Sequence, residues 1–244
     1  MPRFFVPPEV ISGGTARLEG EQAAHAKVLR LTKGDSVILC DGEGTDALCT
    51  VTELSAGQVF LDVIHREPSR SEPRLQCSVY MGFPKADKFE HVVQKATELG
   101  AAEIVVFPCS RSISRPDAKS LAKKLDRWQK IAASAAEQSG RGRIPRVLAL
   151  GSFDEAVTRA SQAEFSALFY ENERTCSLRA AVEAAAFTSA ALMTGPEGGL
   201  TDQEVQLAQQ AGMAVCSLGP RILRCETAPL CVLSALMYAA DELA

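Results

Sequence analysis

Apolar and polar positions divide the chain into two regions with different patterns. Short β-prone runs separated by glycine-containing turns occur at 37–42, 47–54 and 59–65, after a segment of helical spacing at 20–31. Strands at this spacing predict a small β-barrel over residues 1–72. The segment REPSRSEPR, residues 66–74, is rich in proline, serine and charge, and we expect the domain boundary there.

From residue 75 onward, strand-like and helix-like runs alternate. Strands are expected at 75–83, 103–108, 165–170, 189–195 and 214–219, and helices at 87–100, 118–138, 153–160, 177–185, 202–210 and 227–243. This alternation predicts an α/β domain over 73–244, built on a mostly parallel sheet with helices on both faces. In such sheets ligands bind beyond the carboxyl ends of the strands.

Composition narrows the class of protein. The chain is 46% hydrophobic and 23% charged, which is typical of a globular protein. It has no apolar run long enough to span a membrane and no signal-peptide pattern at its N-terminus, so we expect a cytoplasmic protein. The eight cysteines form no C-x-x-C pair and lie mostly in apolar runs, which predicts buried, reduced thiols and no metal site.

Charge is distributed unevenly. The net charge is -4, yet residues 111–146 contain ten basic and only three acidic side chains. A local basic surface can bind phosphate groups even on an acidic protein, although a solvated helix face gives the same pattern.

Three strand exits carry the candidate chemistry. Residues 171–173 (ENE), 195–199 (GPEGG) and 218–221 (LGPR) each follow an expected strand. The glycines of the second exit allow a ligand to approach the backbone closely, and they match neither a phosphate-binding loop nor a dinucleotide fingerprint. Thr201 and Glu204 have the spacing of a capping box for the next helix.

The third exit continues into SLGPRILRCETAPL, residues 217–230. Leu218 to Leu223 would form a loop whose backbone suits recognition of an adenine edge. Arg224, Glu226 and Thr227 then stand at the start of the last helix, where an acidic residue and a threonine are also favourable as caps. Capping and surface ion pairing therefore remain structural alternatives for these polar residues.

These motifs resemble a known family. MTGPEGGLTDQEV followed by LGPRILRCETAPL resembles the signature of bacterial ribosomal RNA uridine-N3 methyltransferases, within the SPOUT superfamily of knotted methyltransferases. HAKVLRLTKGDSVILCDGEG, DKFEHVVQKATELG and AAEQSGRGRIPRV also match, in family order over nearly the whole chain. Cys225 is a departure, because threonine is expected at this position of the motif.

The resemblance implies a PUA-like N-terminal barrel that helps to bind RNA and a C-terminal domain with a deep trefoil knot. It implies a homodimer with the active site at the subunit interface, acting on one uridine of small-subunit (16S) ribosomal RNA, either naked or in the assembled 30S subunit. It also implies that the three strand-exit loops bind S-adenosyl-L-methionine. The cofactor-binding residues would be Phe169, Tyr170, Glu171, Thr194, Gly195, Pro196, Glu197, Gly198, Gly199, Leu218, Gly219, Ile222, Leu223, Thr227 and Ala228.

Methylation of uridine N3 requires loss of the N3 proton, so the site needs a base or a cation that stabilises the resulting anion. We expect Arg224 to stabilise that anion, with Arg221 as a second candidate, and Glu226 to orient an arginine or relay the proton. No histidine lies in the candidate loops, and the base is not identified. Expected phosphate contacts are Arg3, Arg17, Lys27, Arg30, Lys33, Arg111, Arg115, Arg141 and Arg143.

Two other functions remain open. A ribose 2′-O methyltransferase of the same superfamily would use the same cofactor loops. A non-enzymatic RNA-binding protein, with the barrel as reader and the α/β domain as dimerisation module, would bind no cofactor. An enzyme acting on a small nucleotide is less favoured, because it leaves the basic segment and the extra barrel without a role.

Overall fold

The computed structural model describes residues 1–114, 116–183 and 186–243. The chain divides into two compact units, one of Met1–Glu72 with Ala136–Ile144 and one of Pro73–Ala135 with Pro145–Ala244. The first unit is therefore built from two separate stretches of sequence.

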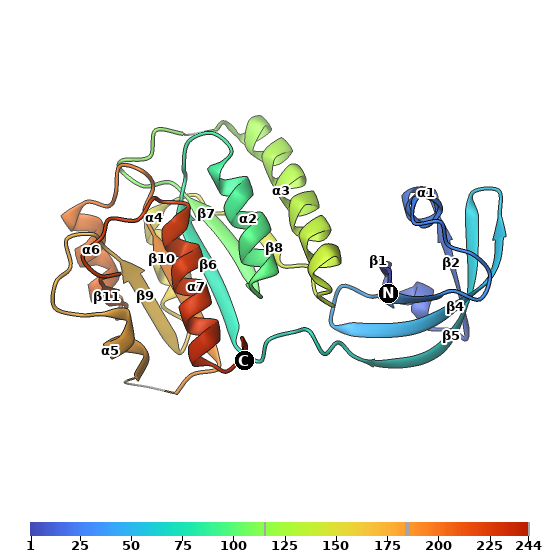
Figure 1. The fold of residues 1–244 in the computed structure, drawn as a ribbon. Coiled ribbons are helices and arrows are strands. Elements are labelled where there is room, and N and C mark those ends of the chain that lie inside the picture. Colours follow the sequence, from blue (N-terminus) through green and yellow to red (C-terminus); the bar gives the residue numbers. More distant parts are fainter. Residues whose placement is uncertain (115, 184–185, 244) are drawn as a thin grey trace. The chain divides into compact units, whose positions relative to one another are not determined.

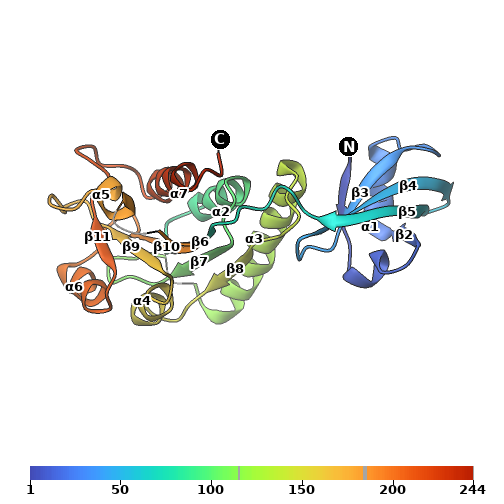
Figure 2. The ribbon, with the colours of Figure 1, turned by 90° about the horizontal axis from the view of Figure 1, so that it is seen from below.

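The first unit is a curled, five-stranded half-barrel (Figures 1 and 2). Its strands have the order β1-β3-β4-β5-β2, in which β1 is parallel to β3 and the other pairs are antiparallel. Side chains alternate along these strands, so one face buries a core that includes Phe4, Leu18, Leu39 and Leu61. The elements are β1 (Arg3–Phe5), a 3-10 helix (Pro8–Ile11), β2 (Thr15–Glu19), α1 (Gly20–Val28), β3 (Ser36–Cys40), β4 (Thr45–Ser55) and β5 (Gln58–Pro68).

Residues 136–144 join the first unit through a buried ion pair. The Arg141 guanidinium donates to the Glu72 carboxylate at 2.7 Å, and its side chain is only 5% exposed. The backbone N–H groups of Gly142 and Arg143 donate to the same carboxylate at 2.9 and 3.0 Å. Glu72 thus fixes a short segment that follows it by about 70 residues in the chain.

The second unit contains a six-stranded sheet of order β11-β9-β10-β6-β7-β8, and every pairing in it is parallel. Its strands are β6 (Gln76–Gly82), β7 (Glu103–Phe107), β8 (Arg146–Ala149), β9 (Phe165–Phe169), β10 (Ser189–Thr194) and β11 (Ala214–Cys216). Its helices are α2 (Lys88–Glu98), α3 (Ala118–Ser139, whose last turn belongs to the first unit), α4 (Phe153–Ala160), α5 (Leu178–Glu183), α6 (Asp202–Gln210) and α7 (Thr227–Ala239). This confirms the predicted α/β class.

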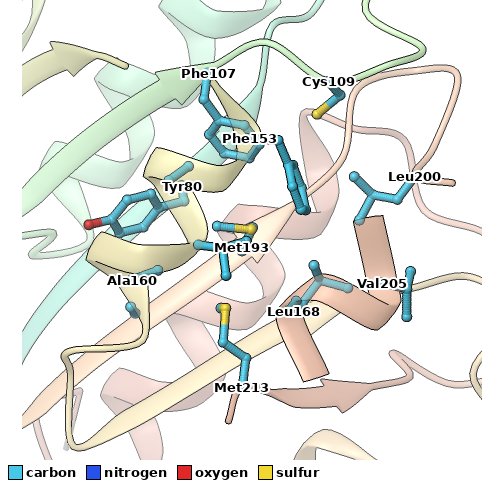
Figure 3. Close-up of a cluster of buried hydrophobic side chains, with 14 of the residues drawn as sticks. Tyr80, Phe107, Cys109, Phe153, Ala160, Leu168, Met193, Leu200, Val205 and Met213 are labelled. Atoms are coloured by element: carbon cyan, nitrogen blue, oxygen red, sulfur yellow. The ribbon is translucent and has the colours of Figure 1, made fainter. Parts of the chain in front are cut away.

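Helices cover both faces of this sheet (Figure 2). Helices α2 and α7 pack on one face, where α7 contacts β6 and β10, while α4 and α6 pack on the other. Figure 3 shows the cluster beneath α4 and α6, in which Tyr80, Phe107, Phe153, Leu168 and Met193 come together from five different elements. Because the core strands are buried on both sides, they are almost continuously apolar.

The sequence pattern located the larger elements and the short strand β11, and it missed four other short elements. Strands β1, β2 and β8 and the 3-10 helix span only three to five residues each, too few for a periodic pattern. The expected linker at 66–74 begins later than predicted, because residues 66–68 still pair with β4. A trefoil knot requires the chain to pass through one of its own loops. Strand order alone does not test this, so the knot stays a prediction.

Candidate functional site

A hollow of about 520 Å³ lies at the carboxyl ends of β9, β10 and β11. Its size is within the range of about 300–1,000 Å³ that is usual for small-molecule sites. After β6 the chain continues to β7 and β8 on one side of the sheet, and after β10 it continues to β11 on the other side. Open parallel sheets bind ligands at such a switch point between neighbouring strands. All three strand exits reach this hollow. The predicted cofactor residues that line it are Phe169, Tyr170, Glu171, Thr194, Gly195, Pro196, Glu197, Gly199, Leu218, Gly219, Ile222, Leu223 and Ala228.

Two predicted cofactor residues are not part of the lining. Gly198 faces the segment after β7: a Cβ added to it would lie 2.9 Å from Cβ of Arg111, and the Arg111 guanidinium donates to the Gly198 carbonyl at 3.1 Å. Thr227 is the first residue of α7, and the N-cap before it is Glu226 rather than Thr227. Neither residue lines the hollow, and their contact with a cofactor stays a prediction.

The GPEGG loop is held tightly where β10 meets α6. Thr201 and Glu204 form the predicted capping box, in which Thr201 Oγ1 accepts from the Glu204 N–H and the Glu204 carboxylate accepts from the Thr201 N–H. The other Glu204 oxygen accepts the Ser110 N–H at 2.7 Å. Gly199 has φ +67°, and a Cβ there would collide with Glu171 Oε1. The positive φ strains any side chain at this position, so glycine is favoured where the loop passes the first strand exit.

The first strand exit forms a compact turn around Glu173. Its carboxylate accepts hydrogen bonds from Thr175 and from the backbone of Cys176, and these bonds lower the pKa of Glu173 to about 2. Arg174, which also lines the hollow, donates to the carbonyls of Glu171 and Glu173 at 2.6 and 2.8 Å. These contacts fix the backbone of the first strand exit, where Glu171 lines the hollow.

The third exit presents charge and apolar surface together. Arg221 and Arg224 both line the hollow and are exposed, and in the described part of the chain neither guanidinium forms an ion pair or a hydrogen bond. Ile222 between them is 85% exposed. This leaves both guanidiniums available to a ligand, and their role in stabilising an anion stays a prediction.

Glu226 is not among the residues that line the hollow, and within the described residues its carboxylate contacts no arginine. Its carboxylate pairs with the ammonium of Lys88 at 3.2 Å and accepts from the Cys225 thiol at 3.2 Å. Burial opposes ionisation of Glu226, but hydrogen bonds from its own backbone, Cys225 and Lys88 outweigh burial and lower its pKa. Burial raises the pKa of Cys225 to about 12, so this thiol stays protonated and can donate.

Lys88 is the most informative residue that the sequence analysis missed. It lines the hollow, and its ammonium pairs with Glu197 at 3.0 Å as well as with Glu226. The bond to Glu197, together with that to Glu226, raises the pKa of Lys88. The sequence contains a signal for this residue, because Lys88 follows the end of β6, the strand that pairs with β10. This fourth strand exit was not among the three candidate exits. Arg174, Ser217, Pro220 and Cys225 are the other lining residues that were missed.

The predicted RNA contacts differ in how far their side chains are exposed and in whether they already have partners. Arg3 and Arg141 are held in ion pairs with Asp46 and Glu72, so little of either side chain faces solvent. Arg17 is half-exposed and pairs with Glu19, while Arg111 is exposed and bonds to Gly198. Arg115 lies outside the described residues. The remaining candidates are exposed: Lys27, Arg30, Lys33 and Arg143.

The cysteines and histidines form no metal site. In the described ranges, no group of three or more candidate ligands lies close enough to hold an ion. All eight cysteines are free thiols and six of them are buried, as predicted. No helix in the described part of the chain is both long and apolar enough to cross a bilayer.

Comparisons with known proteins agree on one family. An RNA methyltransferase domain matches residues 71–237, and an RNA methyltransferase PUA domain matches residues 18–64. The ribosomal RNA small subunit methyltransferase E of Bacillus subtilis is 36% identical over 252 residues, covering 100% of this chain and 98% of that protein.

Two solved structures are similar over their full length. The methyltransferase E of Neisseria gonorrhoeae, bound to S-adenosyl methionine, has a TM-score of 0.87 at 33% identity, covering 98% of this chain and 97% of that one. A methyltransferase of Legionella pneumophila, in complex with the cofactor SAM, has a TM-score of 0.83 at 30% identity, covering 97% of each chain.

Proposed function

The chain belongs to the ribosomal RNA small subunit methyltransferase E family, and we propose that it transfers a methyl group from S-adenosyl-L-methionine to N3 of one uridine in small-subunit (16S) ribosomal RNA. One observation carries this proposal: three strand-exit loops enclose a hollow of cofactor size, and two unpaired guanidiniums, Arg221 and Arg224, stand on its wall. A binding site for a nucleoside cofactor and a site for an anionic reacting base are thus side by side.

The lining supports a bent nucleoside cofactor. The loop Leu218 to Leu223 offers mainly backbone groups and apolar side chains, which suit an adenine, and the Glu171 carboxylate suits the hydroxyl donors of a ribose. Gly199 has no side chain, so the middle loop passes close to Glu171 without occupying the hollow that both residues line. When bound, the cofactor supplies a methyl group on a sulfonium sulfur that a nucleophile can displace in line.

The chain's own residues then have to activate the uridine. N3 becomes a nucleophile when its proton leaves and negative charge spreads to the O2 and O4 carbonyls. Arg224, with Arg221 as the second candidate, stabilises this charge inside a partly enclosed site where such interactions are stronger than in water. We assign relay of the N3 proton to the Glu226 carboxylate, which contacts the lining residues Lys88 and Cys225 and, because its pKa is lowered, is ionised and able to accept a proton near neutral pH.

RNA and a second subunit complete the active form. The exposed cations Lys27, Arg30, Lys33 and Arg143 are available for the phosphate backbone, and the loss of affinity with rising salt measures their contribution. The resemblance implies a homodimer, and the exposed side chain of Tyr238 on helix α7 is available to such an interface. A substrate of ribosomal RNA or the 30S subunit places the protein in the cytoplasm.

Single-turnover methylation of 30S subunits lacking the modification tests the proposal. Arg224→Ala should slow methylation at saturating cofactor by about 100-fold or more, the scale seen when one stabilising donor is removed. Arg179→Ala removes an exposed arginine outside the hollow and should leave the rate unchanged.

The product distinguishes the competing functions. Nuclease digestion and mass analysis should give a methylated uracil base, whereas a methylated ribose would show the 2′-O enzyme. Absence of cofactor binding in calorimetry would instead favour the non-enzymatic RNA-binding protein. An unchanged rate in Arg224→Ala would refute the assignment of this arginine.

A further inference from the structure

We propose that Lys88 is a positioning residue that clamps Glu226 and Glu197 together, holding the Glu226 carboxylate in place to receive the N3 proton of the substrate. This rests on the proposed function, since it names how the proton acceptor of that reaction is held. Lys88 stands at the first position of α2, Glu197 lies in the loop after β10, and Glu226 directly precedes α7. Three segments far apart in the sequence thus meet at one ammonium group.

The hydrogen bonds around Lys88 show why it positions rather than catalyses. An ammonium group has three N–H donors. The described structure supplies three acceptors for them: Glu197 Oε1 at 3.0 Å, Glu226 Oε2 at 3.2 Å and Cys225 Sγ at 3.7 Å. No donor is left over for the uridine, so Lys88 acts on the reaction through the two carboxylates.

Charge supports the same role. Two carboxylates on adjoining loops repel each other unless a cation lies between them. Lys88 supplies that cation, and the Cys225 thiol adds a second donor to the Oε2 atom of Glu226. Cys225 takes the position where the family motif has threonine, and it keeps a donor there. Both contacts favour the ionised form of Glu226.

The backbone reinforces the clamp. The N–H of Lys85, in the turn that leads into α2, donates to both Glu197 oxygens at 3.1 and 3.3 Å. Glu197 is thus fixed from two sides of this turn. The pair formed by Lys95 and Glu98 on the same helix differs, because its partners are only three residues apart and no third segment joins them.

The proton balance of the step is simple. The N3 proton passes to the Glu226 carboxylate as the nitrogen electron pair forms the bond to the methyl carbon, and the electron pair of the carbon–sulfur bond leaves with sulfur. Glu226 then releases the proton to water. Without Lys88, Glu226 loses a bond that holds it in place and keeps it ionised, so a larger fraction is protonated at a given pH.

Amine labelling tests the clamp independently of catalysis. A limiting amount of an acylating reagent reacts with the neutral amine, and the rate at each lysine is read by peptide mass spectrometry. The Lys88 side chain is 30% exposed and that of Lys95 is 39% exposed, so a difference in rate reports mainly on the bonds of the ammonium. We expect Lys88, whose ammonium is held by two carboxylates, to react several-fold more slowly than Lys95, whose ammonium is held by one. Glu226→Gln should accelerate labelling at Lys88 alone.

Methylation kinetics test the consequence. In Lys88→Met, methylation at saturating cofactor should fall by about tenfold or more, within the range of general acid–base effects. The acid limb of its pH–rate profile should move to higher pH, while the cofactor Kd from calorimetry stays within about threefold of wild type. Lys88→Arg keeps a cationic donor and should restore most of the rate. Lys95→Met is the matched control and should resemble wild type.

The outcomes separate this proposal from the proposed function. If wild type methylates uridine and Lys88→Met has the same rate and pH profile, the clamp has no role in the reaction. Equal labelling of Lys88 and Lys95, unaffected by Glu226→Gln, would equally overturn it, even if Lys88→Met did not fold. If wild type makes no methyluridine, the proposed function fails, while the labelling result still decides whether the clamp exists.

Discussion

Gly82 gives the most quantitative test of how the site is assembled. It ends β6, where this strand passes the middle loop of the hollow and the segment after β7. A Cβ added at Gly82 would lie 2.6 Å from Cδ of Pro196, 2.9 Å from the Pro196 backbone nitrogen and 2.6 Å from Sγ of Cys109. Normal contacts between such atoms are about 3.5–4.0 Å, so Gly82→Ala has to displace both Pro196 and Cys109 or shift the end of β6.

The expected cost follows from this crowding. Overpacking a well-packed interior by one methyl group typically costs about 1–3 kcal/mol. For a protein of this size, 1 kcal/mol shifts the thermal midpoint by about 2–4 °C, so Gly82→Ala should melt about 2–12 °C below wild type. Because Pro196 lines the hollow, the cofactor Kd should also rise.

Thermal unfolding followed by circular dichroism measures the first effect, and calorimetric titration with S-adenosyl-L-methionine measures the second. Gly14→Ala is a suitable control, because nothing lies within 4 Å of a Cβ at Gly14. Its midpoint and cofactor affinity should match those of wild type.

A double variant separates the two neighbours of Gly82. Adding Cys109→Ala removes the sulfur atom and should relieve part of the crowding on that side, while the contact with Pro196 persists. In the Cys109→Ala background, Gly82→Ala should lower the melting temperature by less than it does in wild type. The weakened cofactor binding should remain. If Gly82→Ala matched Gly14→Ala in both midpoint and affinity, the close approach of β6 to the cofactor loop would be refuted.

Three further predictions concern single contacts. Thr201→Ala removes one partner of the Glu204 capping box and should lower the free energy of unfolding by about 1 kcal/mol in urea titrations. Arg141→Met leaves Glu72 without its buried guanidinium and should destabilise the N-terminal unit by about 3–5 kcal/mol, seen as faster amide hydrogen exchange in that unit. Glu173 has a pKa of about 2 against an ordinary 4.5, so it stabilises the folded state above pH 4.5 and this contribution disappears as pH falls toward 2. The difference in urea midpoint between wild type and Glu173→Gln should therefore be largest at pH 7 and shrink below pH 4.5; a constant difference would contradict it.

Local patterns were sufficient for much of the fold. The apolar spacing of Phe89, Val92, Val93 and Ala96 predicted α2, and the same residues are buried there. The capping box at Thr201 could be predicted because both of its partners lie within one helical turn. The three strand exits met as expected because parallel strands bring their carboxyl ends to one edge.

Interactions between distant segments were beyond the reach of local patterns. Lys88 and Glu226 are more than a hundred residues apart, and only the order of β6 and β10 in the sheet brings them together. The sequence predicts that Glu226 orients an arginine or relays the proton, whereas its partner in the structure is Lys88 at the start of α2. The contact between Arg141 and Glu72 is equally invisible, because nothing local marks which carboxylate an arginine will meet.

The two-part construction of the N-terminal unit has a consequence during translation. Its first stretch ends at Glu72 and its second ends at Ile144. At a synthesis rate of about 5–20 residues per second, the second stretch is made roughly 4 to 14 seconds after the first. Until then the Glu72 carboxylate cannot pair with Arg141, and the half-barrel is incomplete. The first two strands of the parallel sheet, β6 and β7, are made during this interval. The unit that is encoded first therefore cannot complete its contacts until residues 73–135 of the second unit have also been made.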